Sequence, residues 1–220
     1  MPYSGFTISE FPDLQYGSIY CIGRNYAKHA KEMGSETPSK PVVFLKPRSS
    51  LVYNNGTITL PPESKNVHHE VELVVLIGSK VQKILPEKAH EAIRAVAIGL
   101  DLTARDLQSE AKQKGLPWSL AKGFDTFAPV GKFTDYTPSI DLQNLDIEVR
   151  INNKLRQSGN TSQMIFPVAD LISYLSRHFT LYPGDLIFTG TPEGVGPVKA
   201  GDSITATLQH GLSTLDLHAH

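Results

Sequence analysis

The sequence predicts an α+β fold rich in β-strands and organised as one domain over residues 1–220. The carboxyl half alternates apolar and polar residues over short stretches, as half-buried strands do. Only three or four segments have helical spacing. The chain is long enough to bury roughly 70% of its unfolded surface in one core.

Composition excludes several classes of protein. With 21 Lys and Arg against 22 Asp and Glu, the chain has no basic field for a nucleic acid. The single Cys21 excludes intramolecular disulfides and a C-x-x-C zinc framework. Residues 1–13 lack the pattern of a secretory signal, and no apolar run reaches the ~18 residues of a membrane span. We therefore expect a soluble, cytoplasmic protein that binds neither nucleic acid nor membrane.

The first quarter of the chain is predicted to combine short strands with one helical turn. Ser18–Gly23 is an apolar strand, Tyr26–Met33 favours a helix, and Gly34 ends that helix. Two further strands follow at Pro41–Pro47 and, with an Asn-Gly turn, at Tyr53–Ile58.

His29 and Glu32 are candidate catalytic residues within this first helix. Their spacing places them on one helix face, where the carboxylate can orient the imidazole and raise its basicity. Such a pair is suited to a general base that acts on water. The alternative is a pair on a solvated helix face, which is common in proteins.

The segment Val67–Gly78 is predicted to be the central strand. Its second half is apolar and β-branched, whereas its first half carries two histidines, Glu70 and Glu72. In a strand, the two carboxylates point to the same face, roughly 7 Å apart. They repel each other unless a cation lies between them or the face is open to water, and a divalent metal is the natural cation.

A helix over Pro86–Val96 and a buried strand over Ala97–Leu102 are predicted next, followed by a helix over Ala104–Lys114 with Thr103 as its cap. Asp101 at the end of the strand is a candidate ligand. Its alternative role is to cap the following helix.

Lys122 is a further candidate because it lies among apolar neighbours in a long irregular stretch, Gly115–Pro129. Loops of this length without periodicity are usually functional or disordered, and four large aromatic rings argue for order. A solvated loop lysine is the alternative interpretation.

The remaining chain is predicted to be mainly β, with one amphipathic helix and a glycine-rich loop. The loop Gly190–Pro197 lacks the Lys-Ser/Thr of a Walker motif and precedes no helix pattern, which argues against a nucleotide site. The other expected elements are a hairpin over Leu145–Gln157, a helix over Pro167–Phe179, and strands over Leu186–Gly190 and Ser203–Leu208.

Glu70, Glu72 and Asp101 together predict a metal site at neighbouring strand ends. A set of oxygen ligands suits Mg²⁺, Mn²⁺ or Ca²⁺ better than zinc. His68 shares the strand parity of Glu70 and Glu72, so a His/Glu/Glu zinc site is the competing interpretation.

The order of these motifs resembles the fumarylacetoacetate hydrolase family, within its compact branch of acylpyruvases and oxaloacetate decarboxylases. The resemblance covers nearly the whole chain. It rests on Gly23–Tyr26 with His29 and Glu32, His68–Leu73, Gly99–Asp106, Lys122–Asp125, and Gly190–Gly196.

The resemblance implies a mixed β-sandwich roll with a few peripheral helices, usually a homodimer. It implies that Glu70, Glu72 and Asp101 bind Mg²⁺ or Mn²⁺ and that His29 and Glu32 form a water-activating dyad on a lid segment. It also implies that Lys122 contacts the substrate's oxygens, and that Arg24, Gln108 and Thr191 line the substrate pocket. The lid after Glu32, Ser35–Ser39, is short.

The expected activity is metal-dependent hydrolysis of a 3-acylpyruvate, such as acetylpyruvate or fumarylpyruvate, to pyruvate and a carboxylic acid. His29 would activate the water, Lys122 would stabilise the oxyanion, and the metal would hold the departing enolate. The alternative is decarboxylation of oxaloacetate, or keto–enol tautomerisation or isomerisation of a 2-hydroxy-dienoate dicarboxylate in aromatic catabolism; these reactions need no attacking water. A minor alternative is a metal-stabilised binding protein without turnover.

Overall fold

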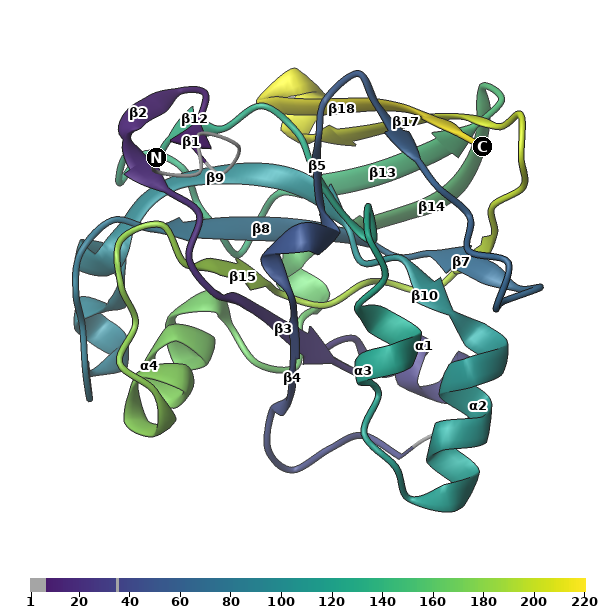
Figure 1. Cartoon of the computed structure of the whole chain (residues 1–220). Helices are drawn as coiled ribbons and strands as arrows, with labels where there is room; N and C mark the ends of the chain where they lie inside the picture. The colour runs from purple at the N-terminus through teal and green to yellow at the C-terminus, as the bar shows by residue number, and fades with distance from the viewer. Residues whose placement is uncertain (1–6, 35) are drawn as a thin grey trace, which may run out of the picture.

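Two β-sheets packed face to face form the centre of the computed structural model, which describes residues 7–34 and 36–220 (Figure 1). Ser35, the first residue of the predicted lid, lies outside the described residues, as do residues 1–6. The large sheet runs in spatial order through β4 (Val42–Lys46), β3 (Ile19–Gly23), β15 (Leu186–Phe188), β8 (Val71–Ile77), β9 (Ile93–Leu100), β11 (Ala128–Val130) and β5 (Leu51–Tyr53), with β12 (Thr134–Asp135) beside β9.

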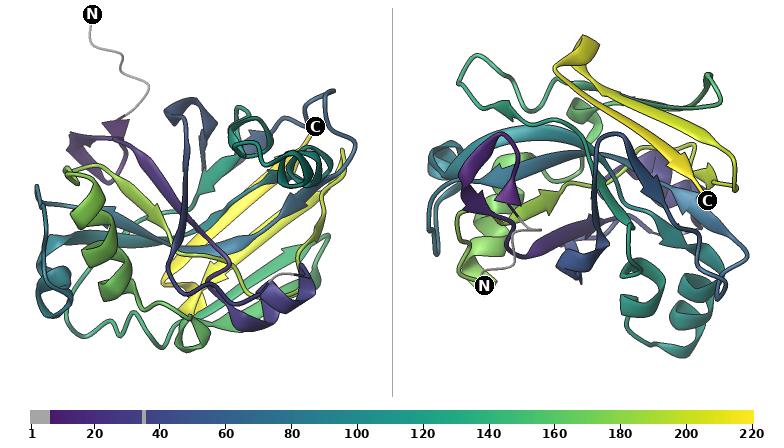
Figure 2. Two further views of the ribbon diagram at one scale, coloured as in Figure 1. Left: turned by 90° about the horizontal axis from the view of Figure 1, so that it is seen from below. Right: turned by 45° about the horizontal axis from the view of Figure 1, so that its top comes forward.

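A five-stranded sheet covers one face of the large sheet, as the green and yellow strands show in Figure 2. Its strands in spatial order are β14 (Lys154–Asn160), β13 (Asp146–Ile151), β17 (Ser203–Leu208), β18 (Ser213–Ala219) and β6 (Gly56–Ile58). The smaller sheets are formed by β10 (Thr103–Ala104), β7 (Val67–His69) and β16 (Gly196–Pro197), and by β1 (Thr7–Ile8) and β2 (Phe11–Gln15).

The helices lie at the periphery, with α2 and α3 at one end of the sheets and α4 at the other (Figure 1). None in the described part of the chain is long and apolar enough to cross a membrane. The α-helices are α1 (Ala27–Glu32), α2 (Arg105–Lys114), α3 (Ser119–Lys122) and α4 (Val168–His178), and the 3₁₀ turns are η2 (Arg48–Ser50), η3 (Pro86–Ala92), η4 (Thr161–Gln163) and η5 (Gln209–Gly211).

Strand β8 is buried on both faces, which explains its continuous apolar sequence. Val71, Leu73 and Val75 pack in the core between the two sheets, whereas Val74 and Leu76 pack on the opposite face of the large sheet. Each such side chain contributes about 1.5–3 kcal/mol when fully buried. Strand β8 therefore anchors Glu70, which directly precedes it, and Glu72, its second residue, to the core.

The predicted α+β class and the mixed sandwich with few helices are confirmed. The hairpin turn at Asn152 and Asn153 has positive φ values of 51° and 63°, as a tight primed turn requires. The predicted helices near Tyr26–Met33 and Pro167–Phe179 correspond to α1 and α4.

The prediction of a helix over Pro86–Val96 is wrong in its second half. A 3₁₀ turn ends at Ala92, and Ile93 begins strand β9. Ala95 and Ala97 face one core while Val96 and Ile98 face the other. A strand that is apolar on both faces has no alternation, so its spacing cannot be distinguished from that of a buried helix.

The predicted cap at Thr103 is also wrong. Helix α2 begins at Arg105, and its N-cap is Ala104 without a side-chain cap. Thr103 instead lies in β10, which pairs with β7, and its hydroxyl donates to Glu70 at 3.0 Å. The irregular stretch predicted after Gly115 contains the short helix α3 and strand β11.

Candidate metal centre and active site

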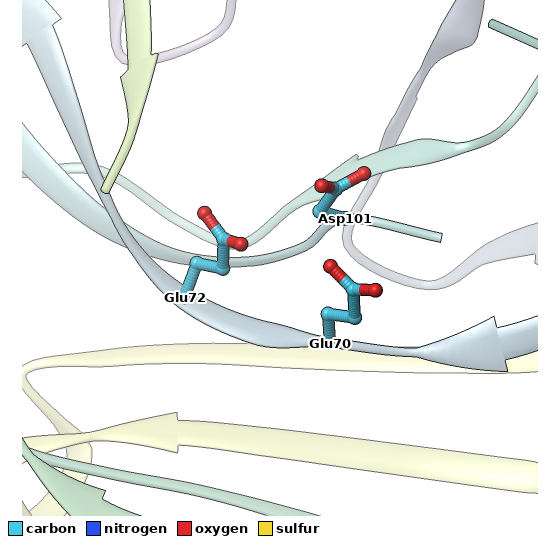
Figure 3. A group of neighbouring side chains, drawn as sticks. All are labelled: Glu70, Glu72 and Asp101. Atoms are coloured by element: carbon cyan, nitrogen blue, oxygen red, sulfur yellow. The ribbon is translucent and has the colours of Figure 1, made fainter. Parts of the chain in front are cut away.

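Glu70, Glu72 and Asp101 lie together at the ends of two neighbouring strands (Figure 3). Glu70 is the residue between β7 and β8, Glu72 is in β8, and Asp101 directly follows β9. The backbone N–H of Asp101 donates to the carbonyl of Glu70 at 2.8 Å, which fixes the two strand ends. One carboxylate oxygen of each residue lies within 4.8 Å of the others, and all three side chains are buried.

Two cations of the protein contact the carboxylates from the pocket side. The ammonium of Lys122 lies 2.9 Å from Glu70 Oε2 and 2.6 Å from Asp101 Oδ2. The guanidinium of Arg105 pairs with Glu70 Oε1 and donates to Gln108 Oε1 at 2.7 Å. Burial alone would raise the pKa of Glu70, but Lys122 and Arg105 outweigh it and hold that pKa well below its usual range.

Lys46 is a buried cation beside the site, and reasoning from the sequence did not identify it. Its ammonium lies 2.7 Å from Asp101 Oδ1. It also donates to the carbonyls of Leu102, Lys122 and Phe127, at 2.9, 2.6 and 2.8 Å. The sequence held one sign of this role, namely a lysine at the end of an apolar strand. Such a lysine is expected to be buried, and a buried ammonium requires partners.

Glu72 is the carboxylate that lacks a cation. It accepts from the backbone N–H of Gly190 at 2.8 Å, and no ion pair involves it within the described residues. Burial and the carboxylates of Asp101 and Glu70 raise the pKa of Glu72 well above its usual value. A divalent cation would relieve this repulsion, and the three acids provide the hard oxygen donors that such a cation prefers. The residues present therefore fit a divalent metal.

His68 does not join this cluster, so the alternative His/Glu/Glu zinc set is not formed in the described structure. Its Nε2 lies 2.9 Å from Asn66 Oδ1. Strands β7 and β8 belong to different sheets, and the chain passes from one sheet to the other at Glu70. The regular alternation of side chains between two faces is therefore interrupted between His68 and Glu72.

His29 and Glu32 are in contact, while their role as a catalytic dyad stays a prediction. His29 Nδ1 lies 3.3 Å from Glu32 Oε2, and Glu32 also accepts from the backbone N–H of Gly194 at 3.0 Å. Burial lowers the pKa of His29, although Glu70 and Glu32 oppose the shift. The lowered pKa favours the neutral imidazole at pH 7, and with Nδ1 protonated toward Glu32 its Nε2 carries the free lone pair.

A small pocket, with a cavity volume of about 30 Å³, adjoins His29, Glu70, Glu72 and Lys122. The predicted substrate-binding residues Arg24, Gln108 and Thr191 line it as well. Glu32 and Asp101 are not part of this lining but contact His29 and Lys122, which are. The structure thus brings together all the residues that the sequence predicted for the site, while their roles toward a ligand stay predictions.

Thr191 is held by a second residue that the sequence did not reveal, Gln157. The buried amide of Gln157 donates to Thr191 Oγ1 and to the carbonyl of Pro192, both at 2.9 Å. Its oxygen accepts from the N–H of Val71 at 3.1 Å and lies 2.8 Å from His69 Nδ1. Gln157 therefore connects the glycine-rich loop to the start of β8.

The sequence of this chain is similar to a known protein family and to named proteins. The family model described as fumarylacetoacetate (FAA) hydrolase C-terminal matches residues 18–217. Mitochondrial oxaloacetate tautomerase FAHD1 of Arabidopsis thaliana is 50% identical over 195 residues, covering 89% of this chain and 87% of the relative. Mitochondrial oxaloacetate decarboxylase of Dictyostelium discoideum is 48% identical over 199 residues, covering 90% of this chain and 89% of the relative.

A solved structure extends the comparison to the fold. The crystal structure of fumarylpyruvate hydrolase from Pseudomonas aeruginosa in complex with Mn²⁺ and pyruvate has a TM-score of 0.89 and 38% sequence identity. It covers 93% of this chain and 90% of that chain.

Proposed function

The chain belongs to the fumarylacetoacetate hydrolase family, and on that premise we propose that it is a metal-dependent enzyme that interconverts the keto and enol forms of oxaloacetate. Its named relatives are enzymes whose names specify small oxo acids. The observation that carries the proposal is a buried His29, in contact with Glu32, beside a cluster of three carboxylates in one pocket.

This proposal reverses the order of the two activities expected from the sequence. The sequence favoured acylpyruvate hydrolysis, and the alternative was oxaloacetate decarboxylation or keto–enol isomerisation of a 2-hydroxy-dienoate dicarboxylate. Relatives named oxaloacetate tautomerase and oxaloacetate decarboxylase favour that alternative, at 50% and 48% identity. The solved relative with the hydrolase name is 38% identical.

Glu70, Glu72 and Asp101 would hold the metal, for which we propose Mg²⁺ with Mn²⁺ as a substitute. When bound, the cation supplies positive charge that attracts the carboxylate and 2-oxo oxygen of the substrate and makes its C3 protons more acidic. Lys46 and Lys122 fix the carboxylate of Asp101 from opposite oxygens.

His29 is the residue suited to move the proton. Its neutral Nε2 takes a proton from C3 of the keto form and releases it to solvent, while the enolate oxygen takes a proton from water to complete the enol; the reverse direction retraces both transfers, and Glu32 orients the ring. Burial would lower the pKa of Lys122, but Asp101 and Glu70 outweigh it and raise that pKa, so Lys122 stays charged. A charged Lys122 can donate a hydrogen bond to the substrate oxygen but cannot act as a base.

Acylpyruvate hydrolysis is the second candidate, because the same His29–Glu32 contact is suited to activating a water molecule. The homodimer and the cytoplasmic location expected from the sequence stay predictions.

The test is to follow the decay of the enol absorbance of oxaloacetate with enzyme plus Mg²⁺, with enzyme plus EDTA, and without enzyme. Acetylpyruvate cleavage and oxaloacetate decarboxylation are measured in parallel. We expect metal-dependent tautomerisation to be the fastest reaction, and His29→Asn to slow it by about 10²-fold or more. Tautomerisation no faster than the buffer rate, with rapid acetylpyruvate cleavage, would establish the second candidate instead.

A further inference from the structure

We infer that Lys112, together with Arg24, forms a subsite for a second carboxylate, so that the pocket selects dianionic over monoanionic 2-oxo acids. The inference rests on the proposed function and identifies the residues that would bind the second carboxylate of the substrate. Lys112 has no role in the metal cluster or the dyad described above.

Helix α2 presents Lys112 to the cavity. Arg105, Gln108 and Lys112 follow one another at intervals of three and four residues, which places them on one helix face, and all three line the cavity. Arg105 contacts Glu70 and Gln108 contacts Arg105, so this face begins at the metal cluster. Lys112 is half-buried, whereas Glu70 is almost fully buried, so Lys112 lies farther toward solvent along the same face.

Trp118 lies beside Lys112 and beside Gly23, the residue before Arg24. The ammonium of Lys112 lies 5.6 Å from the centroid of the Trp118 ring. The same ring packs on Gly23, where a Cβ would lie 3.4 Å from Trp118 Cζ3. The next residue, Arg24, is half-buried, lines the cavity, and has a φ of 59°. A non-glycine residue in this region of the backbone is strained, which is typical of residues constrained by a binding site.

Neither cation has an anionic partner of its own. Within the described residues, no ion pair involves Lys112 or Arg24, whereas Lys114 on the same helix pairs with Glu110. Burial lowers the pKa of Lys112, and the charges of Arg24 and Arg105 lower it further. The surroundings of Lys112 are thus positive, and an incoming anion would relieve them.

The charges of the pocket indicate which anion fits. The carboxylates of Glu70, Glu72 and Asp101 are already matched in number by the cations of Lys46, Lys122 and Arg105. The positive charges of Arg24 and Lys112 exceed this balance, and a divalent metal would add further positive charge. A ligand with one carboxylate at the metal leaves both outer cations unpaired. A second carboxylate on the ligand would supply the missing negative charge for these two cations.

The test compares the binding of L-malate and L-lactate to the Mn²⁺-loaded protein by isothermal titration calorimetry. Both ligands offer a carboxylate and an adjacent hydroxyl oxygen, and only malate has a second carboxylate. We expect malate to bind at least about tenfold more tightly, and Lys112→Met to remove about tenfold of that advantage while lactate binding is unchanged. Lys112→Arg should retain the preference.

Lys114→Met is the matched control, because Lys114 is exposed and on the same helix; it should leave both affinities unchanged. Equal losses for the two ligands in Lys112→Met, no loss for malate, or no preference in the wild-type protein would overturn the inference. Thermal unfolding of each variant checks that the fold is intact. The experiment does not depend on turnover, so selective malate binding without tautomerisation would contradict only the proposed function.

Discussion

Lys122 is the residue whose contacts differ most from what the sequence suggested. The resemblance implied an ammonium directed at substrate oxygens, and the structure shows it between Glu70 and Asp101. It is thus a fixed positive charge beside the metal ligands. That position gives it two opposite effects, since it repels a metal and can attract the charge that develops on a substrate oxygen.

Replacement of Lys122 with methionine should separate these effects. Turnover should fall by about 10²-fold or more, because the pocket loses a donor at the developing oxyanion. Affinity for Mn²⁺ should not fall, because a competing cation has gone from two of the three ligands. Electron paramagnetic resonance titration of Mn²⁺ beside the tautomerase assay measures both. Unchanged turnover would remove Lys122 from the mechanism.

His29 sets the pH dependence of the proposed reaction. Because burial lowers its pKa below the ordinary 6.5, the folded enzyme keeps the neutral base under mildly acidic conditions. Activity should therefore persist as pH falls through 6.5 and should decline only below it. A bound cation nearby shifts the pKa in the same direction.

The measurement is a profile of kcat/KM against pH. His29→Asn should lack the acidic limb that the wild-type enzyme shows. A limb centred above 6.5 in the wild-type enzyme would contradict this assignment. The same shift determines how stability depends on pH. The unfolded state binds the proton of His29 more readily than the folded state does, so the free energy of unfolding decreases as pH falls below 6.5.

Prediction from the sequence succeeded for residues whose chemistry is local. Two acids in alternate strand positions, an acid at a strand end, and a His/Glu pair one helical turn apart each have a recognisable spacing. Lys46 and Gln157 have no such spacing, because their partners are 34 to 88 residues away in the chain. Only the fold shows that their hydrogen bonds end at the site.

At the scale of elements, β8 supports both the core and the site. Leu73 is completely buried between the sheets and lies beside Glu72 in the chain. We expect Leu73→Ala to reduce the free energy of unfolding by about 2–5 kcal/mol, through lost burial and a residual cavity. Leu155→Ala, at a position 48% exposed, should cost less than about 0.5 kcal/mol. Urea titration followed by circular dichroism measures both, and equal effects would contradict this account.

The errors at the element scale share one cause. Residues 93–100 pack against a hydrophobic core on each face of the sheet. Thr103 donates a hydrogen bond to Glu70 and lies in the two-residue strand β10. In both places, tertiary contacts override the local preference for a helix or a cap. The alternating strands β13 and β17 were predictable because each has one exposed face.

At the scale of the whole molecule, metal binding should be coupled to folding, because the three ligands come together only when β8 and β9 pair. Mn²⁺ at 100 times its dissociation constant should stabilise the protein by about 2.7 kcal/mol. We propose that the chain is a single domain, so one unfolding transition should move upward as metal is added. Differential scanning calorimetry with Mn²⁺ and with EDTA tests this, and Glu72→Gln should reduce the shift. Two independent transitions would contradict the single domain.

The resemblance to a family gave the sandwich roll in outline, whereas composition and spacing alone gave only a strand-rich α+β chain. The order of strands in a sheet depends on contacts between distant segments. For example, β15 pairs with β3 and β8, which precede it by more than 100 residues. No local pattern encodes such pairing.

The burial of Glu72 has a consequence for anyone who modifies this protein. Its carboxylate is enclosed beside two others, with a backbone amide as its hydrogen-bond donor and no ion-pair partner within the described structure. Left without a metal, the polypeptide would tolerate a neutral side chain there more easily than the native one. A directed-evolution screen that rewards heat resistance alone, in chelating buffer, would therefore discard this glutamate early and return robust but inert variants.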